Sequence, residues 1–243
     1  MDVTEGHLLG GRVRYAQPRV GYRTGIEPVL LAAAVAARAG ERVLEAGCGA
    51  GAGLLCLAAR VPGITGLGVE LDPGMAALAR DNVARNGFEG LSVEAIDLLA
   101  FEAPAAFDHA FANPPWHAEK ASASPVAGRD VAKRAREGLL GAWIEALVRA
   151  VKPGGTITLA LPAGQFAAAG AGLLAAGAGG VWLLPLWPRA DEAAKLVLVG
   201  AARGSRAVAR VLPGLVLHEG GGFTPAARLI LSDGESLPAA ILR

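Results

Sequence analysis

Four consecutive residues, Asn113-Pro114-Pro115-Trp116, carry groups suited to binding a flat ring that bears an amino group. They follow a short apolar run, Phe107 to Ala112, which is predicted to form a strand. Because proline has no amide hydrogen to give to a sheet, the two prolines end that strand and hold the preceding residue extended. The side-chain oxygen of Asn113 and the carbonyl of Pro114 can accept both hydrogens of an NH2 group, while Trp116 can stack on the ring. The alternative is an ordinary strand end stopped by proline, and four residues alone do not decide between the two.

A glycine-rich turn lies earlier in the chain, in the segment Arg42 to Gly51 (RVLEAGCGAG), and an apolar helical pattern follows from Leu54 to Arg60. Glycines let a ligand approach the backbone, and the helix behind them offers unpaired N–H groups. The next two predicted strands end in Glu70 and Asp97. A carboxylate at the first position can bind the two ribose hydroxyls of a nucleoside cofactor, and the second acid is placed to meet an adenine amine.

Two nucleoside cofactors fit this arrangement. Gly47 to Ala52 also matches the looser dinucleotide pattern G-x-G-x-x-A, so NAD stays an alternative. S-adenosylmethionine is favoured because Glu45 can serve the methionine end of the cofactor, and because Asn113 ends the fourth strand beside the same pocket. Arg23 and Thr24 are weaker candidates for the methionine end, since Thr24 can instead cap a helix.

The candidate cofactor-binding residues are Arg23, Thr24, Glu45, Gly47, Cys48, Gly49, Gly51, Glu70, Leu71, Asp97, Leu98 and Asn113. The candidate catalytic residues are Asn113, Pro114, Pro115 and Trp116. No metal site is expected, because the two cysteines, Cys48 and Cys56, do not have metal-ligand spacing.

In this order and spacing, these residues resemble a class I S-adenosylmethionine-dependent methyltransferase of the amino-methylating kind. The segment Gln17 to Leu31 (QPRVGYRTGIEPVLL) is similar to the N-terminal signature of bacterial tRNA adenine-N6 methyltransferases that act on adenine 37 of a valine tRNA. The resemblance covers roughly residues 8–165. It implies methyl transfer to the exocyclic amine of adenine in RNA, with tRNA as the expected partner. Those relatives usually have Tyr or Phe at Trp116, and Asp at Glu45 and Glu27.

Other acceptors stay open. His117 after Trp116 is similar to the Asn-Pro-Pro-Phe-His loop of rRNA guanine-N2 methyltransferases. A glutamine amide of a release factor is a further planar amine, although those enzymes usually carry a helical domain before the glycine loop. A cofactor-binding, RNA-associated protein without turnover is the alternative from another class, and the intact Asn113 and both prolines argue against it.

The distribution of Arg and Lys indicates where an RNA partner could bind. The net charge is only +1, so binding to nucleic acid must come from local patches. One patch is Arg12, Arg14, Arg19 and Arg23, and the other, assigned to RNA phosphates, is Lys120, Arg129, Lys133, Arg134 and Arg136. The second lies in a segment, residues 117–135, that is expected to form a mobile loop over the site. Nearby acids leave a neutralised, solvated loop as the alternative.

Composition and patterning predict an α/β fold: a doubly wound, seven-stranded, mostly parallel sheet with the last strand pair antiparallel. Of the 243 residues, 53% are hydrophobic, which suits a single methyltransferase domain. We expect an N-terminal lid segment (1–40), a core sheet (41–202) and a C-terminal extension at the sheet edge (203–243). The uncharged stretch 153–188 is interrupted by Pro and Gly and is predicted to be a buried strand–helix–strand unit, not a membrane span.

The expected strands are 42–46, 66–70, 91–96, 107–112, 155–161, 181–186 and 195–201, and the expected helices are 27–38, 52–60, 73–86, 136–151 and 163–176. No signal peptide or membrane partner is expected, so a cytoplasmic protein is predicted, and nothing in the sequence specifies an oligomeric state.

Overall fold

A computed structural model of the chain describes residues 1–20, 23–115 and 127–237, with only the backbone described for 127–137. Seven strands form the centre of one sheet, in the order β5 (Leu91–Ala95), β4 (Thr65–Glu70), β3 (Arg42–Ala46), β6 (Phe107–Ala112), β7 (Val151–Pro162), β9 (Leu196–Arg203) and β8 (Ala178–Trp187). All run parallel except β9, which is antiparallel to both of its neighbours. The predicted mostly parallel α/β sheet is therefore confirmed.

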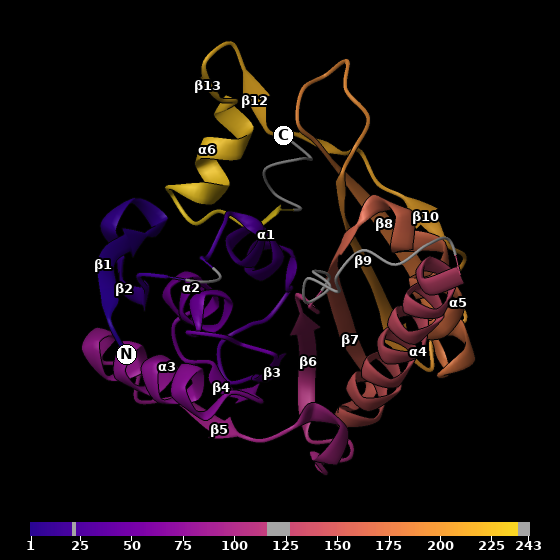
Figure 1. The fold of residues 1–243 in the computed structure, drawn as a ribbon, viewed down its shortest axis with the longest axis horizontal. Helices are drawn as coiled ribbons and strands as arrows, with labels where there is room; N and C mark the ends of the chain where they lie inside the picture. Colours follow the sequence, from indigo (N-terminus) through magenta and orange to yellow (C-terminus); the bar gives the residue numbers. More distant parts are fainter. Residues whose placement is uncertain (21–22, 116–126, 238–243) are drawn as a thin grey trace.

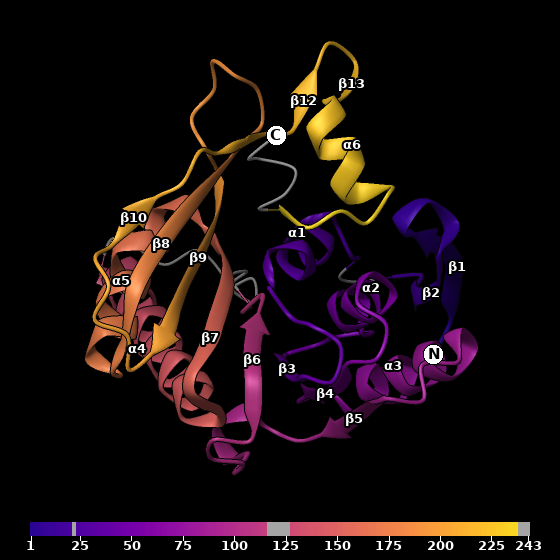
Figure 2. The same cartoon turned by 180° about the vertical axis from the view of Figure 1, so that it is seen from behind.

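Helices cover both faces of this sheet (Figures 1 and 2). One face carries α1 (Glu27–Ala34), α2 (Ala52–Arg60) and α3 (Pro73–Asn86), and the other carries α4 (Ala127–Ala150) and α5 (Phe166–Ala175). Successive strand residues point to opposite faces, so Val43 packs with the first set of helices while Leu44 packs with the second. Both side chains are fully buried, as expected for parallel strands between two helical layers.

Local sequence explains the helix boundaries. The side chain of Asp72 accepts hydrogen bonds from the N–H groups of Gly74 and Met75, at 2.7 and 3.0 Å, and caps α3. Pro73 occupies the first turn and Gly87 ends the helix with a left-handed φ of 66°. Helix α1 was predicted to reach residue 38 but ends at Ala34. The guanidinium of Arg60 from α2 donates to the carbonyls of Ala32 and Val35 where the helix ends.

Two further differences concern the start of α4 and the N-terminal segment. Helix α4 begins at residue 127, so the expectation of a loop over 117–135 is wrong for 127–135. That stretch is rich in Ala, Arg and Lys, which favour helix even without apolar periodicity. Residues 1–18 contain an unpredicted hairpin of β1 (Val3–Leu8) and β2 (Val13–Pro18), joined by the 3-10 turn η1 (Leu9–Gly11).

The C-terminal segment adds two short strands to the sheet. β10 (Arg210–Val211) and β11 (Leu215–Val216) both pair with β8, so the described part of the sheet has nine strands where seven were expected. A small hairpin, β12 (His218–Glu219) with β13 (Gly222–Phe223), and helix α6 (Pro225–Leu231) then rise beside α1 (Figure 1). The uncharged stretch forms β7, α5 and β8, and within the described ranges no helix is long and apolar enough to cross a membrane.

Candidate cofactor and acceptor site

A cavity of about 1120 Å³ opens where β3, β4 and β6 end. Most of the predicted site residues line it: Thr24, Glu45, Gly47, Cys48, Gly49, Glu70, Leu71, Asp97, Leu98, Asn113, Pro114 and Pro115. A site for one small ligand usually measures roughly 300–1,000 Å³. The cavity therefore has room for a nucleoside cofactor together with part of an acceptor.

The glycine loop is held against the neighbouring strand. The N–H groups of Gly47 and Cys48 donate to the carbonyl of Val69 at 2.8 and 3.1 Å, so the chain turns sharply as β3 ends. Gly47 and Gly49 have φ values of 63° and 54°, which side-chain-bearing residues rarely adopt. Gly51 is not among the lining residues; with a φ of 87° it begins α2.

Glu70 connects β4 to the glycine loop. One of its carboxylate oxygens accepts the N–H of Gly49 at 2.8 Å, and the other accepts the N–H of Asp72 at 2.9 Å. Each oxygen keeps a further lone pair, so the carboxylate can still accept hydrogen bonds from ribose hydroxyls in the cavity. Asp97 accepts the N–H of Leu99 at 2.9 Å and caps the 3-10 turn η2 (Leu98–Ala100).

Glu45 is a buried carboxyl, with 4% of its surface exposed. It accepts the N–H of Leu54 at 2.7 Å. Burial raises the pKa of Glu45 to about 8; the Leu54 hydrogen bond opposes that rise, and the charge of Glu70 adds to it. A cation placed in the cavity would favour the ionised form of Glu45, as the ammonium of a methionine moiety would.

The environment of the two cysteines does not favour the reactive thiolate form. Cys48 and Cys56 are both buried free thiols, and burial raises the pKa of each well above its usual range. The thiol of Cys48 lies close to Gly68, where an added Cβ would stand 2.7 Å from the sulfur. No group of three or more metal-ligating side chains is found among the described residues.

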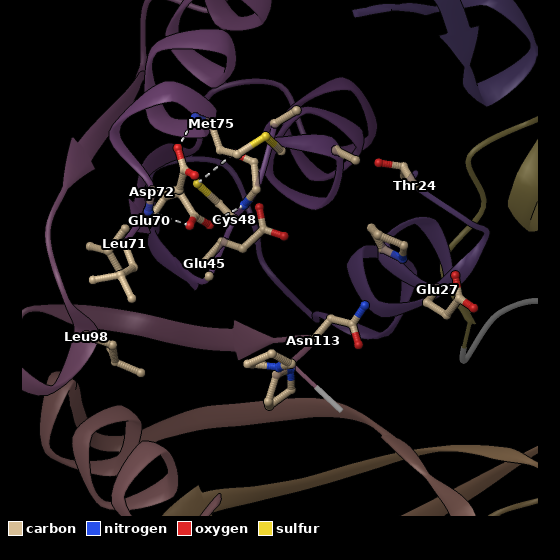
Figure 3. Close-up of a pocket in the computed structure, with 18 of the residues that line it drawn as sticks. Thr24, Glu27, Glu45, Cys48, Glu70, Leu71, Asp72, Met75, Leu98 and Asn113 are labelled. Atoms are coloured by element: carbon tan, nitrogen blue, oxygen red, sulfur yellow. Dashed lines mark hydrogen bonds between the residues drawn. The ribbon is translucent and has the colours of Figure 1, made fainter. Parts of the chain in front are cut away.

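Asn113 and Glu45 line the same cavity, and Figure 3 shows Asn113 between Glu45 and Glu27, with Glu70 and Leu71 on the opposite side from Thr24. Asn113 is half-buried, and no hydrogen bond joins its carboxamide to another residue that the structure describes. Pro114 is buried and Pro115 is exposed. The carboxamide is thus free to bind a ligand beside the glycine loop.

The remaining predicted residues are placed differently. Arg23 is exposed and is not among the lining residues. Trp116 and Lys120 lie outside the described residues. Four more basic residues belong to α4, where only the backbone is described: Arg129, Lys133, Arg134 and Arg136.

Several lining residues were not predicted from the sequence. Tyr15 on β2 is 4% exposed, and its hydroxyl lies 2.7 Å from the hydroxyl of Thr24. Leu139 and Trp143, one turn apart on α4, also line the cavity, and their i, i+4 spacing was the one available signal. An added Cβ on Gly47 would lie 2.8 Å from Cη2 of Trp143. The indole therefore requires glycine at that position.

Three exposed leucine side chains line the cavity. Leu71, Leu99 and Leu139 are 70%, 45% and 40% exposed, and all three line it. Large aliphatic side chains that are this exposed in a cavity are typical of a surface that a flat apolar ligand covers. Together with Asp97 they suit an adenine ring, while Glu70 suits the ribose.

Comparisons with known proteins find similarity to methyltransferases. The family model described as methyltransferase small domain matches residues 26–141. The release factor glutamine methyltransferase of Rhodospirillum rubrum is 33% identical over 159 residues, which is 61% of this chain and 47% of that protein. The chain thus spans about half the length of this curated relative.

Solved structures with a similar fold include further methyltransferases. The crystal structure of a predicted O-methyltransferase from Agrobacterium tumefaciens superposes with a TM-score of 0.70 at 26% identity, covering 84% of this chain and 94% of that one. TYW2 of P. horikoshii, solved in complex with MeSAdo, shares the fold with a TM-score of 0.57 at 16% identity, over 84% of this chain and 72% of its own. The family model and the structure from Agrobacterium tumefaciens thus support a class I S-adenosylmethionine-dependent methyltransferase.

Proposed function

We propose that this protein transfers a methyl group to the exocyclic amine of a planar acceptor, with adenine in RNA, and tRNA first, as the substrate. The observation that carries the proposal is the placement of Asn113 and Pro114 in the same cavity as Glu45 and Glu70. Amine-binding groups and nucleoside-binding groups thus share one enclosure. The likeness to tRNA adenine-N6 enzymes over residues 17–31 supports adenine as the acceptor.

Three carboxylates would hold the cofactor. Glu70 binds the ribose hydroxyls, Asp97 meets the adenine amine, and Glu45 faces the methionine end. When bound, S-adenosylmethionine supplies a methyl group on a positively charged sulfur. The exposed leucines of the cavity suit the adenine ring of that molecule. The carboxylates suit its ribose hydroxyls and its ammonium group.

Asn113 and Pro114 act on the acceptor. The side-chain oxygen of Asn113 and the carbonyl oxygen of Pro114 accept the two N–H hydrogens of the amine, which directs the nitrogen lone pair into the cavity. Positive charge develops on that nitrogen during transfer, and two fixed oxygen dipoles stabilise it. Alignment of the nitrogen with the methyl group contributes much of the remaining acceleration. No strong base is needed, because the cationic product amine is very acidic.

Cationic side chains support an RNA acceptor. Arg19 lines the cavity and pairs with Asp2 at 2.8 Å. Lys195 lines the cavity too and is exposed, so it is placed to meet phosphates around a base that has left its stack. We assign the same role to Lys120, Arg129, Lys133, Arg134 and Arg136. Charge reversal at Arg134 and Arg136 is expected to raise the KM for RNA, more at low salt than at high salt. An unchanged KM at every salt concentration would remove this segment from the RNA site.

A glutamine amide is the second candidate acceptor. The relative from Rhodospirillum rubrum is named a release factor glutamine methyltransferase. The side chain of glutamine also ends in a planar NH2 group, so Asn113 and Pro114 could bind it in the same way. The two candidates differ in the macromolecule that carries the amine, and a labelling experiment separates them.

The test is transfer of tritiated methyl groups by the purified protein to tRNA, to rRNA and to a release factor, with Asn113→Ala as the control. We expect label in tRNA, found as N6-methyladenosine after nucleoside digestion and mass spectrometry. Label in a guanine nucleoside or in glutamine would replace adenine by that acceptor. Tight cofactor binding with no label in any acceptor would contradict the proposed transfer.

A further inference from the structure

The N-terminal hairpin is attached to the methyltransferase core by two asparagines of α3. Asn82 accepts the N–H of Ala16 at 2.9 Å and donates to the carbonyl of Ala16 at 2.8 Å. Asn86 does the same with Arg14, at 2.9 and 2.8 Å. Figures 1 and 2 both show β2 lying against α3. Each carboxamide thus takes the place of a neighbouring strand's backbone.

The spacing of the two pairs explains why this contact is regular. Four residues along a helix rise about 6 Å. Two residues along a strand rise about 7 Å. The spacing of Asn82 and Asn86 on the helix therefore matches the spacing of Ala16 and Arg14 on the strand. The two asparagines bind alternate residues along one edge of β2.

The two asparagines differ in one contact. Nδ2 of Asn82 also donates to the carbonyl of Ala50, at 3.0 Å, and Ala50 directly follows Gly49 in the glycine loop. Nδ2 of Asn86 donates instead to the carbonyl of Asn82, within its own helix, at 2.7 Å. Asn82 is fully buried, with all three hydrogen bonds made to backbone groups. One amide thus holds both the hairpin and the loop that binds the cofactor.

The hairpin contributes a wall of the cavity. Tyr15 lies between the two bound residues of β2, lines the cavity and pairs with the hydroxyl of Thr24. The N–H of Thr24 in turn donates to the side chain of Gln17, also on β2, at 2.9 Å. A shift of β2 along α3 would therefore move Tyr15 and Thr24 relative to the glycine loop.

We propose that Asn82 is a positioning residue, which fixes the glycine loop and the Tyr15–Thr24 wall of the cavity in one relative geometry. Asn82 does not line the cavity and acts only through Ala16 and Ala50. The expected effect of Asn82 on cofactor binding requires only that the cofactor is S-adenosylmethionine. The expected effect on acceptor binding rests on the proposed function.

The chain supplies a matched control for the test. Asn82→Ala and Asn86→Ala each remove a pair of hydrogen bonds to β2, but only the first also releases Ala50. Binding of S-adenosylhomocysteine is measured by calorimetry beside the unfolding temperature of each variant. We expect about tenfold or greater weakening in Asn82→Ala and less than about twofold in Asn86→Ala. Similar Kd values for the two variants would overturn the proposal, whatever their unfolding temperatures.

Two further measurements keep the test decisive. Where Asn82→Ala does not fold, Asn82→Leu keeps the branched shape of the side chain while removing the same hydrogen bonds, and the same Kd comparison is made with Asn86→Leu. Once an acceptor is known, Asn82→Ala should raise the KM for both cofactor and acceptor, whereas Asn86→Ala should leave the cofactor KM unchanged. Loss of kcat alone would contradict a positioning role. Because the calorimetry needs no acceptor, its result stands even if the proposed acceptor is wrong.

Discussion

Replacement of Glu45 by Gln should stabilise the protein and impair its cofactor binding at the same time. Glu45 is 4% exposed, and burial raises its pKa from 4.5 to about 8. The folded empty protein therefore binds a proton that the unfolded chain releases above pH 4.5. Stability is lost as the pH rises from about 4.5 to about 8, because ionised Glu45 is tolerated in water but not in the buried site.

The magnitude follows from the same pKa values. Each unit of difference between the folded and unfolded pKa is worth about 1.4 kcal/mol, so the ionised carboxylate costs the folded protein roughly 3–5 kcal/mol above pH 8. Gln carries no charge and keeps an oxygen to accept the N–H of Leu54. The stability gained by Glu45→Gln should be near zero at pH 4.5, should grow with pH, and should level off above pH 8.

Urea unfolding of both proteins without cofactor, at pH 5, 7 and 8.5, measures this difference. Glu94→Gln, at an exposed position on β5, is the control for loss of a negative charge and should follow the wild type. Calorimetry on the same samples should show weaker binding of S-adenosylhomocysteine to Glu45→Gln. If wild type and Glu45→Gln lose stability in parallel across this range, the buried carboxyl does not have the pKa on which the reasoning depends.

Two more substitutions test the cofactor site. Glu70→Ala should weaken S-adenosylhomocysteine binding by about 10-fold or more, because hydrogen bonds to a charged acceptor contribute roughly 1.5–3 kcal/mol each; an unchanged calorimetric Kd would remove Glu70 from the site. Gly47→Ala adds a methyl group 2.8 Å from the indole of α4 and should lower the free energy of unfolding by about 1–3 kcal/mol beyond the cost of Gly204→Ala. Gly204 has a similar φ but open space around it, so equal losses of stability in urea unfolding would rule out the steric contact.

The parallel sheet and the glycine loop were predictable because their signals are local. Glu45, Gly47 and Glu70 stand at strand ends, and the carboxyl ends of parallel strands meet at one edge of the sheet. Their convergence on one cavity follows from topology. Asn113 was predictable for the same reason, since proline ends its strand at that edge.

The rest of the cavity depends on contacts that leave little trace in sequence. The N-terminal hairpin buries Val13 and Tyr15 in the core, but its alignment on α3 is set by hydrogen bonds from Asn82 and Asn86, which hydrophobic periodicity does not reveal. Trp143 reaches the glycine loop from a helix whose neighbours are set only by tertiary packing. Strands β10 and β11 have two residues each, too short for any periodic pattern.

The central claim is that Asn113 binds the acceptor amine within the enclosure that holds the cofactor. Its most direct test is the single-turnover rate of methyl transfer by Asn113→Ala, with cofactor and acceptor both saturating. We predict a rate at least ~100-fold below that of the wild type, with an unchanged Kd for S-adenosylhomocysteine. Transfer at the wild-type rate would contradict the claim.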